Sequence, residues 1–338
     1  MTAVNRRIVL AARPHGEPNA SHFRLEETRI PVPKAGEVLL ANRYLSLDPY
    51  MRGRMSAAKS YAEPVAIGDT MVGATVAEVV ASNHPDHAVG ETVVGFGGWQ
   101  DFFVSDGRGL RRLDPAAAPV TTALGVLGMP GMTAYTGLRN IGRPKAGETV
   151  VVAAATGPVG SLVGQIARRQ GARAVGIAGG PEKCAYLTDT LGFDAAVDHR
   201  AEDFPDALAA ACPDGIDVYF ENVGGAVFDA VLPLLNAFAR VPICGLVSGY
   251  NATELPSGPD RVPLLLRAVL TKRLHLQGFI VWDFAAQEQD FLAEVGGWLR
   301  EGLIVHREDI VDGLENAPDA FAGLLKGRNF GKLIVRIR

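Results

Sequence analysis

Apolar residues in the first 120 positions fall into short runs that glycine and proline interrupt. These runs cover residues 37–44, 70–82, 91–96 and 101–104. Strand-length apolar runs between turn residues are typical of β-structure, and several in succession favour a barrel-like sheet. This part of the sequence therefore predicts a β-rich domain.

From about residue 123 the pattern changes, because strand-like runs now alternate with helical stretches. The strand-like runs are 149–154, 174–178, 195–198, 217–221 and 240–246, and the helical stretches between them include 160–170, 181–191 and 226–235. Such alternation is typical of a doubly wound parallel sheet. A last run at 332–338 is expected to pair in the first domain. The sequence predicts an α/β protein with domains 1–122 plus 308–338 and 123–307.

The run at 149–154 leads directly into Ala-Thr-Gly-Pro-Val-Gly at 155–160, and a helical stretch follows. This order is typical of the Rossmann turn that binds dinucleotides, with Ala155 at the first of the usual glycine positions. Gly157 lets the backbone approach a pyrophosphate, and Gly160 lets the helix pack closely on the sheet. The pyrophosphate is expected at the helix N-terminus, where unpaired N–H groups favour anions. The expected cofactor contacts are Thr156, Gly157, Pro158, Val159 and Gly160.

The next strand-like run indicates which dinucleotide binds. NAD sites usually carry Asp or Glu about 20 residues after the glycines, where it binds the ribose 2′-hydroxyl. Here the run ends in Gly179 and Gly180, and Lys183 follows with an ammonium group that can pair with a 2′-phosphate. Glu182 is assigned to the first turn of the next helix, where an acid is favoured for its own reasons. The pattern predicts NADPH, with a solvated helix lysine as the alternative interpretation of Lys183.

Composition and charge narrow the class of protein. The formal net charge of −4 lacks the basic excess of nucleic-acid-binding proteins. Three widely spaced cysteines do not suggest a disulfide framework. The sequence shows neither a signal-peptide pattern nor an apolar stretch of membrane-spanning length. We therefore expect a cytoplasmic protein with a small-molecule substrate and no nucleic-acid or membrane partner.

The sequence also lacks the ligands of the zinc ion that medium-chain alcohol dehydrogenases use to polarise an alcohol oxygen. No cysteine precedes position 184, and residues 71–74 read Met-Val-Gly-Ala where such enzymes carry a Gly-His-Glu segment. His84 and His87 lie in a Pro/Asp/Gly-rich turn without a third ligand and are interpreted as surface residues. No metal is predicted, and hydride addition to an already electrophilic C=C bond is the favoured chemistry.

Several segments together resemble one family. They are LSLDPYMRGRM at 45–55, GVLGMPGMTAYTGL at 125–138, YFENVGG at 219–225, ICGLVSGYN at 243–251 and GRNFGKLIVRI at 327–337. The sequence resembles the zinc-independent medium-chain dehydrogenases/reductases of the leukotriene B4 12-hydroxydehydrogenase, prostaglandin reductase and alkenal double-bond reductase group. Within that group it is most similar to the branch of bacterial NADPH-dependent curcumin reductases.

The resemblance implies a split GroES-like catalytic domain beside a Rossmann NADPH-binding domain, with the active site in the cleft. It also implies a homodimer formed through the Rossmann domains. The implied reaction is NADPH-dependent reduction of the C=C bond of α,β-unsaturated ketones and aldehydes. His199 departs from the family, where many members carry Tyr beside the adenosine phosphate, but a His can still bind a 2′-phosphate.

Hydride transfer to the β-carbon leaves negative charge on the carbonyl oxygen, and a neutral tyrosine hydroxyl is a suitable donor to that oxygen. Tyr250 is the leading candidate because it follows the strand-like run 240–246, and ligands bind beyond the carboxyl ends of such strands. By resemblance, Tyr50 is a second catalytic tyrosine, and Tyr61 joins both in the substrate pocket. The remaining expected cofactor contacts are Met132, Thr133, Gly179, His199, Asn222, Cys244, Gly245, Tyr250 and Asn329.

Two other functions fit the same sequence. A quinone reductase shares the zinc-free fold and the cofactor, and a turnover test with enones and simple quinones separates it from an enone reductase. A non-catalytic NADPH-binding protein is the second alternative. The presence of Tyr50, Tyr250 and Asn329 together argues against it, because a scaffold needs no hydroxyl donor beside nicotinamide.

Overall fold

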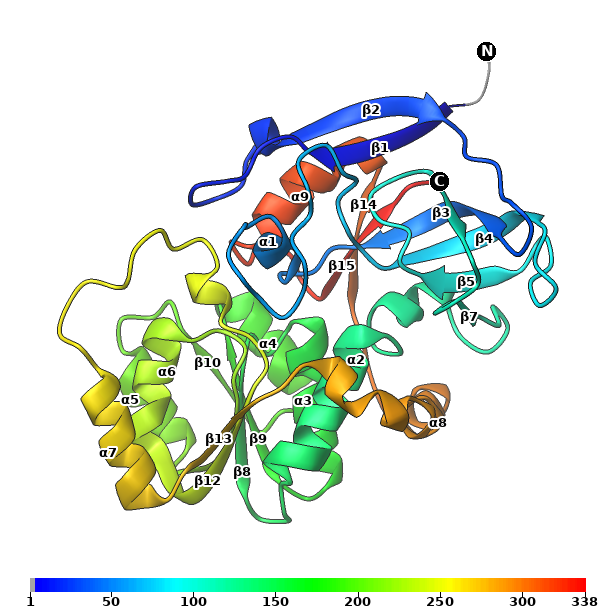
Figure 1. Ribbon diagram of the computed structural model, residues 1–338. Coiled ribbons are helices and arrows are strands. Elements are labelled where there is room, and N and C mark those ends of the chain that lie inside the picture. Colours follow the sequence, from blue (N-terminus) through cyan, green and yellow to red (C-terminus); the bar gives the residue numbers. More distant parts are fainter. Residues whose placement is uncertain (1–3) are drawn as a thin grey trace. The chain divides into compact units, whose positions relative to one another are not determined.

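A computed structural model describes residues 4–338 of the chain and separates them into two units (Figure 1). One unit takes the residues up to Gly125 together with Glu308–Arg338, and the other is Val126–Arg307. The domain boundary expected from the sequence falls after residue 122 rather than after Gly125. Each unit is described below by itself.

Within residues 126–307, six strands form one parallel sheet. The strands are β8 (Thr149–Ala153), β9 (Arg173–Ala178), β10 (Ala195–Asp198), β11 (Ile216–Phe220), β12 (Leu235–Ile243) and β13 (His275–Gly278). Their order across the sheet is β10-β9-β8-β11-β12-β13, with every pair parallel. This is the Rossmann order, which reverses between β8 and β11. The predicted doubly wound α/β fold is confirmed.

Helices cover both faces of this sheet (Figure 1). One face carries α2 (Met129–Gly137), α3 (Pro158–Arg169), α4 (Pro181–Asp189) and α8 (Glu288–Arg300), and the other carries α5 (Phe204–Ala211), α6 (Gly225–Val231) and α7 (Val262–Lys272). Short helical turns are η3 (Leu138–Gly142), η4 (Leu232–Leu234), η5 (Val247–Gly249) and η6 (Val281–Gln287).

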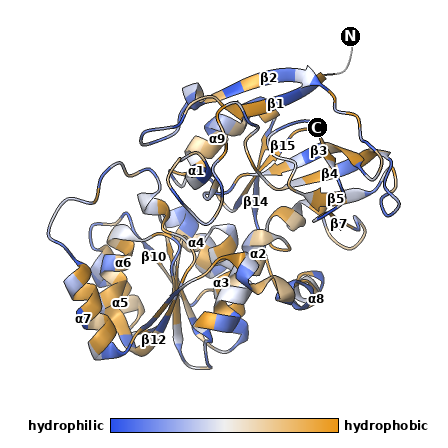
Figure 2. Cartoon of the chain, viewed as in Figure 1, coloured by the Kyte–Doolittle hydropathy of each residue, from blue (hydrophilic) through white to orange (hydrophobic). Residues whose placement is uncertain are grey.

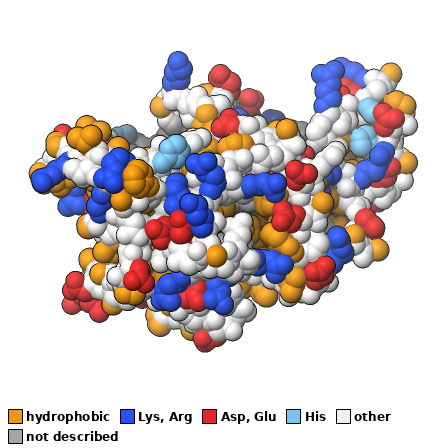
Figure 3. Space-filling view, turned by 90° about the horizontal axis from the view of Figure 1, so that it is seen from below, with side chains coloured by type: hydrophobic (Ala, Val, Ile, Leu, Met, Phe, Trp, Pro, Cys, Tyr) orange, Lys and Arg blue, Asp and Glu red, His pale blue; other side chains and the backbone are white. Residues whose placement is uncertain are grey.

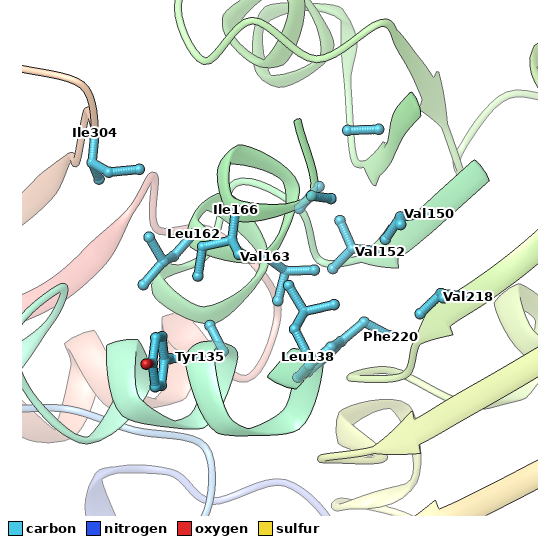
Figure 4. Close-up of a cluster of buried hydrophobic side chains, with 14 of the residues drawn as sticks. Tyr135, Leu138, Val150, Val152, Leu162, Val163, Ile166, Val218, Phe220 and Ile304 are labelled. Atoms are coloured by element: carbon cyan, nitrogen blue, oxygen red, sulfur yellow. The ribbon is translucent and has the colours of Figure 1, made fainter. Parts of the chain in front are cut away.

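Strand β8 lies at the centre of two hydrophobic cores. Val150 and Val152 face the core formed with α2 and α3, on the side where Val163 and Phe220 lie (Figure 4). The alternate residue Val151 faces the core formed with α5 and α6. All of these side chains are fully or almost fully buried. A strand buried on both faces reads as a continuous apolar run, which is why the sequence located this strand correctly.

In the other unit, seven strands of the described chain form a mixed sheet. They are β3 (Val38–Ser46), β4 (Thr75–Ser82), β5 (Thr92–Gly95), β6 (Phe102–Ser105), β7 (Arg111–Arg112), β14 (Glu308–Asp312) and β15 (Lys332–Arg336). The order is β14-β15-β3-β4-β5-β7, and β6 also pairs with β3. The expected pairing of the C-terminal strand in this unit is confirmed, because β15 lies antiparallel to β3.

A separate hairpin of β1 (Val4–Leu10) and β2 (Phe23–Arg29) completes this unit, with α1 (Met51–Arg54), α9 (Ala317–Leu324) and the turns η1 (Ala20–His22), η2 (Val120–Leu124) and η7 (Leu314–Asn316). The sequence reading missed the hairpin and was wrong about residues 70–74, which precede β4. Thr70 instead forms an isolated bridge with Val9 of β1, and the Met71 N–H donates to the Ile8 carbonyl at 2.9 Å.

The surface agrees with the modest net charge. On the face shown in Figure 3, basic and acidic side chains are interspersed. Within residues 4–338, no helix combines the length and the apolar character that crossing a membrane requires.

Candidate functional site

The turn between β8 and α3 has the geometry expected for a phosphate-binding turn. Gly157 precedes α3, and among the described residues no side chain caps this helix, so its first N–H groups are not bonded by a cap. A Cβ added at Gly160 would lie 2.6 Å from the carbonyl oxygen of Ala154, so only glycine allows this close approach of helix and strand. Ala155 occupies the position of the usual first glycine. Its methyl group is accommodated because the neighbouring residue on β9 is Gly176, where an added Cβ would lie only 2.9 Å from that methyl.

Basic side chains gather where β9 ends. A Cβ added at Gly179 would lie 2.9 Å from Nε2 of His199 and 2.8 Å from Nε of Arg200, so both side chains lie over this glycine. Lys183 stands half-buried in the first turn of α4. Burial lowers the pKa of His199, and the neighbouring Arg200 charge lowers it further. Arg200 was not identified from the sequence.

The carboxylate of Asp198 is the nearby acid at this edge, and backbone amides hold it. Its Oδ1 accepts hydrogen bonds from the N–H groups of Gly180 and Arg200, each at 2.9 Å. The Gly180 hydrogen bond holds the pKa of Asp198 below its usual value. The Asp198 carboxylate therefore stabilises the backbone at Gly180 and Arg200, beside the His199 and Arg200 side chains.

The turn after β11 is organised by a buried glutamate. Oε1 of Glu221 accepts hydrogen bonds from the N–H groups of Val223 at 2.7 Å and Gly224 at 2.8 Å. The side chain of Asn222 in the same turn donates to the carbonyl of Ala153, at the end of β8, at 2.8 Å. This bond fixes the turn at the point where the strand order of the sheet reverses, which is where ligands bind in such sheets. Sequence reasoning placed Glu221 at a strand end and gave it no role.

Beyond β12, the chain returns to the same turn. The N–H groups of Cys244 and Gly245 donate to the backbone carbonyl of Glu221 at 2.9 and 3.2 Å. Burial raises the pKa of the Cys244 thiol to about 12, which favours the protonated thiol over the nucleophilic thiolate. The half-buried Tyr250 follows η5, and a Cβ added at Gly245 would lie 3.3 Å from its hydroxyl oxygen.

Helix α2 carries Met132 and Thr133, both expected near nicotinamide. Met132 is buried in the core of this unit. The Thr133 hydroxyl donates to the backbone carbonyl of Met129 at 2.8 Å. The structure thus assigns both side chains packing or helix contacts, and their cofactor contacts stay predictions.

The other unit carries Tyr50, Tyr61 and Asn329. Tyr50 immediately precedes α1, and burial, followed by the charge of Asp48, raises the pKa of its hydroxyl. Tyr61 is exposed in the loop before β4. The Asn329 side chain donates to the carbonyl of Gly331 at 2.8 Å. A buried ion pair of 2.8 Å between Lys332 and Asp48 connects the segments that carry Asn329 and Tyr50.

The two histidines of the surface turn make local contacts. Nδ1 of His87 lies 3.1 Å from the carboxylate of Glu91, and the His84 ring packs beside it. In residues 4–338 no cluster of three or more His, Cys, Asp or Glu side chains has the arrangement of a metal site.

Comparison with known proteins places this geometry in a family. Two protein-family sequence models match the chain. The family described as "N-terminal domain of oxidoreductase" matches residues 6–113, and the family described as "Zinc-binding dehydrogenase" matches residues 158–295. The NADPH-dependent curcumin reductase of Escherichia coli (strain K12) is 60% identical over 98% of this chain and 97% of its own length. The NADP(+)-dependent 2-alkenal reductase of Nicotiana tabacum is 39% identical over 98% of this chain and 97% of its own length.

A solved structure shows the same architecture. The crystal structure of CurA from Vibrio vulnificus in complex with NADPH matches with a TM-score of 0.95 and 57% identity, and the match covers 98% of this chain and 99% of that one. The family resemblance inferred from the sequence is confirmed. The chain belongs to the medium-chain dehydrogenase/reductase family, in the group that contains the NADPH-dependent curcumin reductases and the 2-alkenal reductases.

Proposed function

We propose that the protein reduces the C=C bond of α,β-unsaturated ketones and aldehydes with NADPH. The observation that carries this proposal is the position of Tyr250, whose hydroxyl lies against Gly245 beside the Asn222 turn, at the carboxyl ends of β11 and β12. A neutral hydroxyl donor at this edge of a Rossmann sheet suits a reaction that develops an oxyanion next to nicotinamide.

The residues present fit NADPH. The start of α3 offers uncapped backbone N–H groups to the pyrophosphate, and Gly157 and Gly160 keep that approach open. The side chains over Gly179 supply positive charge for the 2′-phosphate from Arg200, with Lys183 in the adjoining helix turn. His199 adds a ring nitrogen to the same place.

Bound NADPH supplies the hydride that adds to the β-carbon of the substrate, and a proton delivered to the α-carbon by an acid or water completes the reduction. Tyr250 donates a hydrogen bond to the carbonyl oxygen, which becomes enolate-like as the hydride arrives. Burial raises the pKa of Tyr50, so this second tyrosine also remains a neutral donor at ordinary pH. We propose Tyr50 as the second catalytic tyrosine and the exposed Tyr61 as a residue of the substrate pocket.

The test is NADPH oxidation with a panel of enones and enals that includes a curcuminoid, run in parallel with NADH and with simple quinones. We expect NADPH-specific turnover with the enones, and a large loss of kcat in Tyr250→Phe, because the ring stays while the donor is removed. A Tyr250→Phe enzyme with wild-type kcat would leave the reaction class intact and remove Tyr250 from it. Turnover with quinones alone would indicate a quinone reductase, and NADPH binding without any turnover a non-catalytic protein.

We also propose that the protein is a homodimer formed through the Val126–Arg307 unit. Helix α7 exposes Val262, Leu266 and Leu270, which follow one another at intervals of four residues and so share one face of the helix, and much of the helix is coloured as hydrophobic in Figure 2. Among the described strands β13 pairs only with β12 and is an edge of the sheet. Exposed apolar surface of this kind favours association. Light scattering should show a dimer, and Leu270→Glu should shift it toward monomer; a monomeric wild type would reject the proposal.

We also propose that the protein is located in the cytoplasm, a reducing compartment in which cysteines stay as free thiols. In the described chain Cys184, Cys212 and Cys244 are all free thiols. Cell fractionation with antibody detection is the direct test, and recovery outside the cytoplasmic fraction would contradict this location.

A further inference from the structure

Glu221 lies almost fully buried, 2% exposed, directly after β11. The two oxygens of its carboxyl group differ sharply in their surroundings. Oε1 accepts three hydrogen bonds, from the Tyr219 hydroxyl at 3.0 Å and from the N–H groups of Val223 at 2.7 Å and Gly224 at 2.8 Å. Oε2 is equally buried, yet no residue in 4–338 donates a hydrogen bond to it.

This asymmetry is informative because an ionised carboxylate shares its charge between both oxygens. A buried charge without a donor or a cation is costly, and no ion pair involving Glu221 occurs in the described part of the chain. The titratable groups that face it are Tyr219 on its own strand and Cys244 beyond β12, neither of which is cationic. A proton on Oε2 removes the charge and leaves all three bonds to Oε1 in place.

We propose that Glu221 is a positioning residue of the reductase site, which in its protonated form fixes the 222–224 turn and, through that turn, the segment that carries Tyr250. The proposal rests on the proposed enone reductase function. Burial raises the pKa of Glu221 although the backbone donors lower it, in agreement with the protonated form.

The connection from Glu221 to Tyr250 consists of short hydrogen bonds. The carbonyl of Val223 accepts from the Ser248 N–H at 3.0 Å and from the Ser248 hydroxyl at 2.6 Å. The carbonyl of Asn222 accepts from the Val247 N–H at 3.2 Å. Residues 247–249 form η5, whose last turn leads into Tyr250. A displaced 222–224 turn therefore displaces the hydroxyl donor, and it also displaces Asn222.

Three variants test the proposal. Glu221→Gln keeps an acceptor at the Oε1 position and is neutral at every pH. Glu221→Asp keeps a carboxyl but withdraws it from the turn by one methylene group. Glu254→Gln is the control, because it removes a carboxylate four positions after Tyr250 on an exposed part of the loop. For each enzyme we would measure kcat, KM for enone and NADPH, the Kd for NADPH, the pH profile of kcat and the circular dichroism spectrum.

We expect Glu221→Gln and Glu254→Gln to stay within about twofold of wild-type kcat, and Glu221→Asp to lose about 10- to 100-fold, because small displacements at a reacting centre have effects of that size. Wild-type kcat should fall as the pH rises through the Glu221 pKa, and the decline due to this group should be missing in Glu221→Gln. A folded Glu221→Gln enzyme that loses as much kcat as Glu221→Asp would overturn the proposal. Wild-type kcat in Glu221→Asp would overturn it equally.

The NADPH Kd separates this proposal from the proposed function. If none of the enones supports NADPH oxidation by the wild-type enzyme, the proposed function is rejected. Asn222, an expected NADPH contact, still lies in the turn that Glu221 fixes. Glu221→Asp should then bind NADPH several-fold more weakly than wild type, and Glu221→Gln should match wild type. Equal Kd values for all the variants, in that case, would reject the positioning role as well.

Discussion

The hydroxyl of Tyr250 lies against the α-carbon of Gly245, so that a Cβ added at Gly245 would meet the hydroxyl oxygen at 3.3 Å. The same Cβ would lie 3.4 Å from the backbone carbonyl of Asn222. A methyl group at position 245 would therefore press on both the Tyr250 hydroxyl and the Asn222 turn.

Gly245→Ala is expected to lower kcat with enones by about tenfold, because the methyl group pushes the Tyr250 hydroxyl away from its position and reactivity depends steeply on such displacements. Gly249→Ala is the matched control, since apart from its chain neighbours a Cβ there would meet no described atom within 4 Å. Steady-state kinetics on both variants checks this. Equal kcat for the two would show that the Gly245 contact does not limit the hydroxyl.

Arg200→Ala should raise the KM for NADPH by about tenfold or more, since a hydrogen bond to a charged group contributes about 1.5–3 kcal/mol. The KM for NADH should change little, because NADH has no 2′-phosphate. The ratio of kcat/KM for the two cofactors is the measurement, and NADH serves as the internal control. A parallel loss with both cofactors would mean that Arg200 supports the turn rather than the phosphate.

Glu221→Gln should gain stability relative to wild type as the pH rises through the raised folded-state pKa of Glu221. A carboxyl with a raised folded-state pKa stabilises the fold most below its unfolded-state value, which is about 4.5, and loses that contribution as the pH rises through the folded pKa. Glutamine does not titrate, so the difference in Tm, variant minus wild type, increases with pH. Thermal melts at several pH values measure it; a constant difference would indicate an ionised Glu221.

Lys332→Met should destabilise the unit that contains β15 by about 3–5 kcal/mol, because it leaves the Asp48 carboxylate buried without its partner. The double variant with Asp48→Asn should recover part of this loss, since the uncompensated charge is gone. Denaturant unfolding of the two single variants and the double variant gives the coupling energy. Additive effects would show that the ion pair contributes little.

The elements that the sequence predicts correctly are those whose hydrophobic and glycine pattern lies within one short segment of the chain. The run of valines in β8 and the glycines after it define a buried strand and a dinucleotide turn without any tertiary information. The β1–β2 hairpin was missed because charged residues such as Arg6 and Glu27 pair across it and weaken its apolar pattern. In the same way, β12 begins at Leu235, several residues before the expected start, because Asn236 and Arg240 interrupt its apolar run.

The site residues that escaped prediction depend on contacts across the sheet. Arg200 reaches Gly179 because β10 pairs with β9 in a register that aligns Asp198 with Ala178. Glu221 gains its role from donors in a turn that only the folded chain brings around it. Neither relationship follows from residue type or spacing. The role of Tyr250, in contrast, was inferred from its place after the strand-like run 240–246, and the roles of Tyr50 and Asn329 from the family pattern. All three roles remain predictions.

The position of β15 between β14 and β3 has a consequence for the order in which the chain can fold. During synthesis, β3 is made early, but its neighbour β15 follows only after the whole Val126–Arg307 unit has emerged. Until then β6 can pair with the Val38–Ala41 part of β3, but Tyr44–Ser46 lack their antiparallel neighbour, and Leu45 and Leu47 lack the core partners Leu333 and Val335. Unpaired edges and exposed apolar surface promote aggregation. Translation that stalls before residue 332 therefore leaves a nascent chain in which one unit is fully synthesised and the sheet and core of the other are incomplete.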